Sequence, residues 1–412
     1  MSVAAILIWT ALAQAAAPPP SMAGPGLTLE QALEIALARN PEVLAARAEV
    51  EAARGRTLQL GAGPDPQLVA GFEGAPLPGT KDEGEDIEVS LGVEQVFEFP
   101  GKRALRAEIG GYGEKLASAE LERTELLVAA RVKRAYWKGV FARSAVQALE
   151  KSSGRLDVLL ADLHAKYRTG AAAYADVLRA RAEKARLRNQ VIEQERERRA
   201  AGLELDALLA RPADAPVELV TELAFAPLAA DWSGIWERAR TSRPSVRIAA
   251  LREGRAEAAL KLAGLNRNPD FQAGVFLPSV RFGGWGLSFG LTLPFLRPGR
   301  TKGLVLEAGA EADAARVKAD AVERRVRSAM EDAYAAAKAA EEQVLVFERS
   351  LLRELDDELR IQLEYVRYGK ADVYGLLDLH RTYVLAELDH LRAVLLYNLA
   401  LADLEVAGEE SE

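Results

Sequence analysis

The fold of this chain is decided by residues 102–167, which read KRALRAEIGGYGEKLASAELERTELLVAARVKRAYWKGVFARSAVQALEKSSGRLDVLLADLHAKY. This stretch favours helix throughout and contains no proline. At a rise of 1.5 Å per residue, a helix of this length spans about 99 Å. Helices in globular proteins average about 11–12 residues. The stretch therefore predicts a helical layer or tube rather than an ordinary domain.

The sequence contains an internal repeat. Pro41 in ARNPEV recurs as Pro244 in TSRPSV, at an offset of 203 residues. Further along, Tyr136 recurs as Tyr334, at an offset of 198. Internal repetition of this kind indicates that one structural unit occurs twice in the protein.

The change of offset falls in residues 74–87, which are rich in Pro, Gly, Asp and Glu and indicate an exposed loop. Two repeats are therefore expected, at residues 28–211 and 231–407, with a proline-containing link at 212–230.

Each repeat predicts the same order of elements. A short helix and a second helix precede two strands, and two very long helices follow. The expected second helices are 42–62 and 245–265, the strands are 66–74, 86–97, 270–280 and 285–296, and the long helices are 102–167, 171–210, 301–367 and 371–407.

The strands show a period of two. In 86–97 one face carries Ile87, Val89, Leu91 and Val93, and the other carries Glu88, Ser90, Gly92 and Glu94. Segment 285–296 alternates in the same way, and Gly283-Gly284 predicts a tight hairpin turn before it. About ten residues is the length that a tilted strand needs to cross a bilayer. A soluble sheet with one buried face predicts the same alternation.

Composition excludes several classes of protein. The 412 residues carry 53 basic and 61 acidic side chains, a net charge of −8, which does not fit a nucleic-acid-binding protein. The chain has no cysteine and only three histidines, so disulfides, thiol chemistry and a metal site are not expected. The sequence contains no nucleophile motif, P-loop or dinucleotide motif, so we expect neither a cofactor nor an enzyme.

The first residues predict a secretory signal peptide. An apolar run at residues 4–13 leads into Ala13-Gln14-Ala15, which suggests cleavage by residue 17, although no Lys or Arg precedes the run. This run is too short for a spanning helix, and no other stretch is long enough. If the protein enters a membrane, strands must carry it there.

Four transmembrane strands cannot close a barrel, because known single-chain barrels begin at eight strands. An open sheet edge in lipid leaves backbone groups unsatisfied. The strand count therefore predicts that several chains share one barrel. Three chains in cyclic symmetry give twelve strands and a ring of long helices.

Three stretches resemble TolC-type outer-membrane factors: LTLEQALEIALARNPEVLAARAEVEAARG, YRTGAAAYADVLRARAE and YGKADVYGLLDLHRTYVLAELDHLRAVLLYNLALADLE. The junctions FEFPGKR and LPFLRPGR are similar to the heavy-metal-efflux branch, the cobalt–zinc–cadmium and copper–silver type. The resemblance covers essentially all of residues 27–407.

The resemblance implies a mainly α protein with membrane β-structure. It would be a homotrimer with a twelve-stranded barrel in outer-membrane lipid, a coiled-coil helical tunnel of roughly 100 Å in the periplasm and no catalytic activity. Its partners would be a periplasmic adaptor, or membrane fusion protein, and an inner-membrane pump. Drug efflux and type I secretion compete with metal efflux, and an adaptor or a coiled-coil scaffold is the alternative of another class.

The two expected helix reversals carry candidate functional residues. Each holds a glycine where a tight reversal favours positive φ. The resemblance implies adaptor docking at these tips, for which we select Thr169, Gly170, Ala171, Gly369 and Lys370. A plain helix cap explains the same glycines.

A periplasmic gate is expected beside the tips, formed by Asp176, Asp372, Asp378, Arg367 and Tyr368. In a threefold assembly each aspartate becomes a ring of carboxylates, which selects cations by its field. Stabilisation of a helix N-terminus explains Asp176 and Asp372 equally well.

The gate departs from the family pattern at two positions. Gly375 stands where relatives have the first of two aspartates, and Val366 stands where a tyrosine partner of Asp176 is expected. Tyr365 or Tyr368 could replace that tyrosine. In the strands, Glu88 and Glu94 are expected to line the barrel lumen, although ordinary solvation also explains them.

Overall fold

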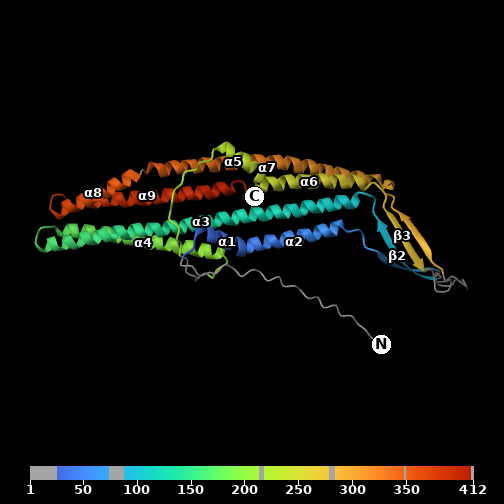
Figure 1. Ribbon diagram of the computed structural model, residues 1–412, viewed down its shortest axis with the longest axis horizontal. Coiled ribbons are helices and arrows are strands. Elements are labelled where there is room, and N and C mark those ends of the chain that lie inside the picture. The colour runs from blue at the N-terminus through green and yellow to red at the C-terminus, as the bar shows by residue number, and fades with distance from the viewer. Residues whose placement is uncertain (1–25, 74–87, 213–217, 278–283, 348, 410–412) are drawn as a thin grey trace, which may run out of the picture.

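The computed structural model describes residues 26–73, 88–212, 218–277, 284–347 and 349–409. The expected signal peptide, the loop at 74–87, the strand ends at 74, 86–87 and 278–280, and Gly283 of the hairpin turn lie outside these residues. The protein is elongated, with the strands at one end and both helix reversals at the other (Figure 1).

The first repeat begins with two capped helices. The side chains of Thr28 and Gln31 cap α1 (Leu29–Arg39) reciprocally. The side chain of Asn40 accepts from the N–H of Glu42 (2.9 Å), and Pro41 occupies the first turn of the next helix. The elements that follow in this repeat are α2 (Pro41–Gly61), β1 (Gln67–Glu73), β2 (Glu88–Phe97), α3 (Lys102–Arg168) and α4 (Tyr174–Leu208).

The second repeat has the same order of strands and long helices. Its elements are α5 (Trp232–Ser242), α6 (Pro244–Leu265), β3 (Phe271–Leu277), β4 (Gly286–Leu291), the 3₁₀ helix η1 (Pro294–Leu296), α7 (Pro298–Val346), α8 (Arg349–Arg367) and α9 (Val373–Val406).

The prediction of one unbroken helix over 301–367 is wrong. Helix α7 starts at Pro298 and stops at Val346, and α8 starts at Arg349. Phe347 has φ −81° and ψ 67°, outside the helical region, and its ring meets His390 of α9 edge-on. The β-branched Val344 and Val346 just before it weaken the local helix preference. The ring contact between Phe347 and α9 therefore competes with the weak helix preference of the residues just before it.

Two other predicted boundaries also need correction. The expected strand 285–296 ends at Leu291, and Pro294 opens a 3₁₀ turn instead, since proline lacks an N–H and β4 lies at the sheet edge. The expected helix 171–210 starts three residues later, at Tyr174, because Ala173 is extended and serves as the cap.

The four strands form one antiparallel sheet in the order β1-β2-β3-β4. Strand β2 pairs with β3, from Leu91 opposite Leu277 to Phe97 opposite Phe271. The two repeats are thus joined through the middle of the sheet.

The helices form an extended layer behind the sheet. Helix α3 lies beside α2 toward the sheet and beside α4 toward the reversals, and α6 and α9 take the corresponding places in the second repeat (Figure 1). Helix α3 also packs against α6 and α9, so it touches both repeats. Among the described helices none is both long and apolar enough to span a bilayer.

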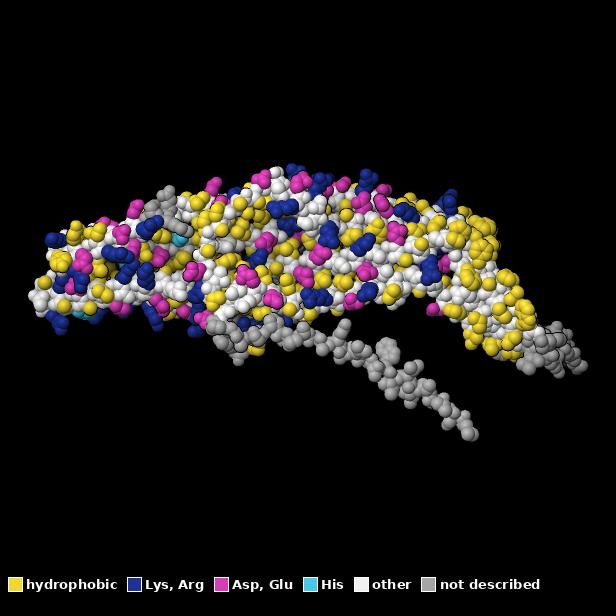
Figure 2. All heavy atoms as spheres, viewed as in Figure 1, with side chains coloured by type: hydrophobic (Ala, Val, Ile, Leu, Met, Phe, Trp, Pro, Cys, Tyr) yellow, Lys and Arg dark blue, Asp and Glu magenta, His cyan; other side chains and the backbone are white. Residues whose placement is uncertain are grey.

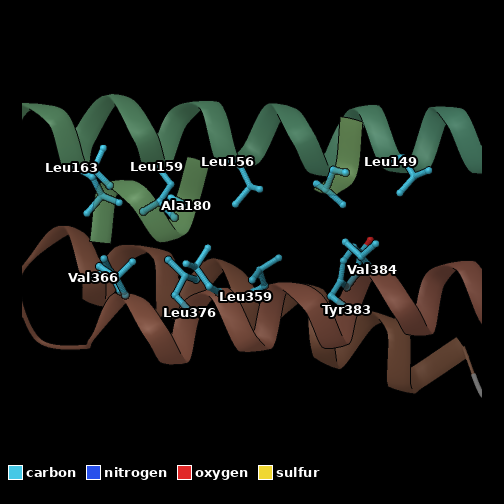
Figure 3. Packing of buried hydrophobic residues seen from close by; sticks show 14 of the residues in the cluster. Leu149, Leu156, Leu159, Leu163, Ala180, Leu359, Val366, Leu376, Tyr383 and Val384 are labelled. Atoms are coloured by element: carbon cyan, nitrogen blue, oxygen red, sulfur yellow. The ribbon is translucent and has the colours of Figure 1, made fainter. Parts of the chain in front are cut away.

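The largest apolar cluster lies near the helix reversals. Leu149, Leu156, Leu159 and Leu163 of α3 face side chains of α8 and α9 (Figure 3). Each of these leucines is at least 98% buried, and burying a leucine fully stabilises a fold by about 1.5–3 kcal/mol. This cluster holds the first helical hairpin, α3–α4, against the second, α8–α9.

Candidate functional site

The sheet has one continuous apolar face. Register places Leu68 beside Val93, and Val93 beside Val275, and Val275 beside Leu287 across the four strands. These side chains are exposed, as are most large residues on this face. Figure 2 shows hydrophobic side chains gathered over this end of the protein, whereas charged ones are spread over the helices. An exposed apolar patch of this extent marks a contact with lipid or protein.

Aromatic residues lie at both ends of this region. Phe97 and Phe271 are paired where the strands meet the helices, and Trp285 precedes β4 at the opposite end. All three are more than half exposed. Aromatic side chains at both borders of an apolar band are typical of membrane strands.

The opposite face of the sheet is polar and rich in glycine. Strand β2 presents Glu94 here, whose carboxylate accepts hydrogen bonds from Gln272 and from Ser288 (3.2 Å). Gly274 lies directly opposite Glu94, and a Cβ there would approach the Ser288 hydroxyl to 2.4 Å. The glycine therefore leaves room for a polar cluster spanning three strands.

The two residues expected to line the lumen, Glu88 and Glu94, both belong to β2. Glu94 lies on the polar face, and Glu88 is six residues away on the same strand, opposite Glu73. The side chain of Glu88 lies outside the described residues.

Both helix reversals have the same backbone geometry. Gly170 has φ 76° and Gly369 has φ 69°, in the left-handed region that favours glycine. In the first reversal the N–H of Ala171 donates to the carbonyl of Lys166 (2.8 Å). In the second, the N–H of Lys370 donates to the carbonyl of Tyr365 (2.8 Å). These bonds close each helix with the same cap.

The predicted docking residues lie together at the end of the molecule. Thr169, Gly170, Ala171, Gly369 and Lys370 are all exposed. The hydroxyl of Thr169 donates to the carbonyl of Lys166 (2.9 Å), so its visible role is to cap α3.

A groove of about 480 Å³ separates the two reversals and collects most of the predicted gate. Its lining includes Asp176 from the first hairpin and Arg367, Tyr368 and Asp372 from the second. One bond crosses between the hairpins beside it, from Lys166 Nζ to the carbonyl of Val366 (2.8 Å). Sequence reasoning missed this bond, because a lysine in a helix gives no signal of a distant carbonyl partner.

The expected tyrosine partner of Asp176 is replaced by other contacts. The carboxylate of Asp176 pairs with Arg179 on its own helix (3.1 Å). Val366 is 3% exposed and belongs to the apolar cluster between the hairpins, while Tyr368 is 75% exposed. Position 366 therefore strengthens the apolar packing between the hairpins.

The two acidic residues of the second hairpin differ in position. Asp372 caps α9, where its side chain accepts from the N–H of Gly375 (3.2 Å). This is the helix-cap role that the sequence offered as the alternative. Asp378 is exposed and lies on α9, six residues beyond Asp372. It does not line the groove that collects the other gate residues.

A buried polar layer lies deeper between the hairpins. His380 of α9 is 3% exposed, and its Nε2 contacts the carbonyl of Ser152 in α3 (3.2 Å). Nearby, Glu183 of α4 is 3% exposed and pairs with Arg381 (2.6 Å). Burial lowers the pKa of His380 below its ordinary range, and the Ser152 carbonyl only partly opposes this shift. This histidine is therefore a packing residue between the hairpins.

Comparison with known proteins agrees with this architecture. Residues 32–211 match the family model described as outer membrane efflux protein. No curated protein matches the sequence.

Solved structures match over nearly the whole chain. The outer-membrane channel OprN is similar with a TM-score of 0.77 at 20% identity, covering 93% of this chain and 91% of OprN. CusC, whose description refers to transmembrane channel formation, gives 0.75 at 18%, covering 92% of each chain. The outer membrane protein VceC of Vibrio cholerae gives 0.74 at 18%, covering 93% of this chain and 97% of VceC.

The family model covers the first repeat, and the structural matches cover both repeats. Residues 32–211 are thus similar to the outer membrane efflux protein family, and nearly the whole chain has the fold of the solved structures of OprN, CusC and VceC.

Proposed function

We propose that this protein is one subunit of a homotrimeric outer-membrane channel, a passive exit duct for an efflux system. The observation that carries the proposal is the sheet, with an exposed apolar face, an opposite polar face and two outer strands that each have one free edge among the described residues. In lipid such edges must be paired. The apolar face would contact lipid and the polar face, with Glu88 and Glu94, would line the duct.

The internal repeat suggests how copies join. Within one chain the first repeat meets the second through β2 with β3 and through α3 with α6. The second repeat carries the equivalents of β2 and α3, namely β4 and α7, whose outer sides have no such neighbour within the described chain. A second copy would supply β1 and α2 in the places that β3 and α6 occupy. Head-to-tail repetition of this contact gives a closed ring.

The offsets predict the register of the subunit contact. Gln95 lies opposite Ala273 inside the chain. The equivalent of Gln95 in the second repeat is Leu293, which lies 198 residues later. The equivalent of Ala273 in the first repeat is Ala70, which lies 203 residues earlier. We therefore expect Leu293 to lie opposite Ala70 of the partner subunit, with β4 extended beyond Leu291 on pairing.

Pro294 does not prevent this extension. The N–H of Thr292 donates to the carbonyl of Asp270, on the β3 side. Alternate residues of a strand point their backbone groups to the same side. The missing N–H of Pro294 would therefore lie on the β3 side, and Leu293 keeps its donor toward the open edge.

Cysteine crosslinking tests the assembly directly, because the chain has no cysteine. The double variant Leu293→Cys/Ala70→Cys should oxidise to covalent dimers and trimers in outer-membrane preparations, since opposed strand residues have the Cα separation of a disulfide. The control Leu293→Cys/Gly71→Cys places one thiol on the other face and should crosslink at least tenfold less. Crosslinks confined to single chains, or recovery of the protein in the soluble fraction, would contradict the proposal.

The helical hairpins would form the periplasmic tunnel and its gate. We propose that the tips dock on a periplasmic adaptor, which couples the duct to an inner-membrane pump. An adaptor itself would carry one hairpin, whereas this chain has two in tandem with a sheet. Site-specific photocrosslinking from Thr169 and Lys370 should capture the adaptor. The same probe at Arg198, an exposed residue far along α4, is the control.

Asp378 is proposed to face the aperture of the assembled gate. Asp378→Ala should weaken block of the reconstituted trimer by multivalent cations, because a ring of three carboxylates attracts them. Asp389→Asn changes an acid further along α9 and serves as the control. Unchanged block in Asp378→Ala would remove this residue from the aperture.

Heavy-metal cations are the proposed cargo, on the basis of the junction sequences FEFPGKR and LPFLRPGR. Drug efflux and type I secretion are the competing cargo classes. Structural similarity does not separate these branches, since OprN, CusC and VceC match almost equally. A deletion strain should lose tolerance to zinc, cobalt, cadmium or copper more than to drugs. Unchanged metal tolerance would contradict the metal branch.

A further inference from the structure

Two ion pairs join the repeats where α6 of the second repeat packs on α3 of the first. Glu120 of α3 pairs with Arg252 of α6 (3.2 Å), and Glu122 of α3 pairs with Arg247 of α6. All four side chains are at least 40% exposed. The pairs therefore lie at the surface of the helical layer, where their charges can distinguish one neighbouring helix from another.

At the first of these positions the repeat reverses both charges. The equivalent of Glu120 in the second repeat is Lys318 of α7, which lies 198 residues later. The equivalent of Arg252 in the first repeat is Glu49 of α2, which lies 203 residues earlier. Where α7 of one copy meets α2 of the next, the places of a carboxylate and a cation are thus taken by a cation and a carboxylate.

The second position does not show this reversal. The equivalent of Glu122 is Asp320, again an acid, and the equivalent of Arg247 is Leu44, which has no charge. An ion pair between copies is therefore expected only at the position of Lys318 and Glu49.

Lys318 is available for a partner outside its own chain. It is exposed and has no ion-pair partner among the described residues. With Arg252 and Glu311 it lines a groove of about 310 Å³ between α6 and α7, so two cations and one acid are the charged groups of this lining. A second carboxylate would balance the charge there.

Glu49 is similarly accessible. Its side chain is 70% exposed and pairs with Arg56 on the same helix (3.3 Å). Exposed pairs of this kind contribute little to stability. Glu49 can therefore pair with a cation of a neighbouring copy at little cost to its own chain.

We propose that Lys318 and Glu49 of the partner subunit form an ion pair that selects which helix of one copy binds α2 of the next. The inference rests on the proposed function, which brings α7 and α2 together. On α7, Glu49 of the partner subunit meets Lys318. On α3, the equivalent helix of the first repeat, it would meet Glu120, and two like charges repel each other. The charges therefore favour a ring in which first and second repeats alternate.

The expected size of this selection is modest for each contact. An exposed ion pair is weak, and replacing it by two like charges costs a similar amount again. Reversing one charge should therefore weaken each contact about fivefold. Salt should reduce the effect, because it screens exposed charges.

Proximity of the two positions can be measured in outer-membrane preparations of the full chain. A short bismaleimide should bridge Lys318→Cys/Glu49→Cys into covalent dimers and trimers. In the control, Asp313→Cys replaces Lys318→Cys. Asp313 is exposed about 140° around α7 from Lys318, and its equivalent Lys115 stays exposed although α6 packs on α3. The control should give at least tenfold less product, and equal yields would overturn the contact.

Charge reversal tests the ion pair itself, with the Leu293→Cys/Ala70→Cys crosslink as the measure of assembly. Lys318→Glu and Glu49→Lys should each slow formation of crosslinked trimers about fivefold. The two together should restore the parent rate within about twofold, and Asp313→Lys should leave it unchanged.

Recovery in the combined variant also shows that each single variant can fold. Arg56 cannot supply this recovery, since it repels a lysine at position 49. Parent-like rates for both single variants, or no recovery when they are combined, would overturn the ion pair.

The two crosslinks separate this inference from the proposed function. If the strand crosslink forms and neither charge reversal changes its rate, the ion pair is wrong and the shared barrel stands. If the bridge between positions 318 and 49 forms without the strand crosslink, the helical contact is supported and the shared barrel is contradicted. Failure of both crosslinks would contradict the assembly and the ion pair together.

Discussion

In the first repeat the long helix α3 runs unbroken from Lys102 to Arg168, whereas its equivalent in the second repeat is divided at Phe347 into α7 and α8. Helix α3 is packed by α2 and α4 of its own repeat and by α6 and α9 of the other. Helix α7 packs mainly on α6 and α9, and many of its large apolar side chains, such as Leu306 and Val317, are exposed. Position along the chain, more than sequence, decides which of the two long helices is fully packed, because within the described chain α3 has helices of both repeats beside it and α7 has only helices of its own repeat.

The largest expected effect tests this difference in packing. Tyr136 of α3 is fully buried, and its hydroxyl contacts the carbonyl of Leu27 (2.8 Å) and Thr221 (2.6 Å). Its equivalent, Tyr334 of α7, is only partly buried and rests against Trp232. Tyr136→Ala should lower the free energy of unfolding by about 3–5 kcal/mol, and Tyr334→Ala by about 1 kcal/mol.

Urea denaturation of the detergent-solubilised protein, at one protein concentration for both variants, measures this difference. Equal losses in Tyr136→Ala and Tyr334→Ala would show that the two repeats are packed alike.

A smaller effect on stability is expected at a position where the two repeats use different residues to bind the carbonyl end of a long helix. Asn40 donates to the carbonyl of Leu208 at the end of α4 (3.0 Å), and Arg243, at the equivalent position, donates to the carbonyls of Leu404 (2.8 Å) and Glu405 at the end of α9. Arg243→Ala should cost about 2–3 kcal/mol, because charged hydrogen bonds are lost next to the buried Glu409.

Asn40→Ala is the matched variant and should cost about 1–2 kcal/mol, since it loses a helix cap and one neutral bond. The same denaturation experiment applies. A larger loss of unfolding free energy for Asn40→Ala than for Arg243→Ala would contradict the prediction that the second repeat has the stronger of these two contacts.

The interface between the repeats should respond to pH through His380. Burial lowers the pKa of this side chain, with Arg155 and Arg381 acting in the same direction and the Ser152 carbonyl and Glu183 opposing. The unfolded chain therefore binds more protons than the folded one below about pH 6.5, the ordinary pKa of histidine. Stability from this group is present above that pH and is lost as the pH falls.

Lowering the pH from 7 to 5 should reduce the free energy of unfolding by about 1 kcal/mol more in the parent than in His380→Gln. Glu387 is present in both proteins, so its raised pKa, caused by burial, cancels in the difference. Identical pH profiles for parent and His380→Gln would contradict the prediction.

The smallest effect concerns the ends of α4 and α9. Ala210, just beyond α4, has φ 51°, while the left-handed residue just beyond α9 is Gly408. Ala210→Gly should stabilise the protein by about 0.5 kcal/mol, because relief of the strained φ slightly exceeds the added freedom of the unfolded chain. Ala207→Gly, inside α4, should instead destabilise it by about 1 kcal/mol. Thermal melting measures the stability change of both variants. Destabilisation by Ala210→Gly would contradict the prediction that the left-handed φ of Ala210 is strained.

Much of the fold could be predicted from the sequence because its signals are local. The period of two in β2, the proline-free run of α3 and the glycines of the reversals each appear within a few neighbouring residues. The break at Phe347 was missed because it depends on a ring contact with His390, which lies far along the chain. The end of β4 was missed because an edge strand and a proline compete with the alternation pattern.

The candidate site was predictable only in part, for the same reason. The reversals and their exposed residues followed from the position of Gly170 and Gly369. The bond from Lys166 to Val366 and the contact of His380 with Ser152 did not, because each joins helices whose mutual packing has no local signature.

The pairing of β2 with β3 has a consequence for how the chain folds. The whole of α3 and α4 lies between these strands in the sequence. Contacts between residues so distant along a chain form slowly, because the entropy of closing the long loop must be overcome first. The hairpin α3–α4 needs only local contacts and should collapse early. The sheet should therefore be the last part of the monomer to order, so that its apolar face is completed only after the helical part is in place.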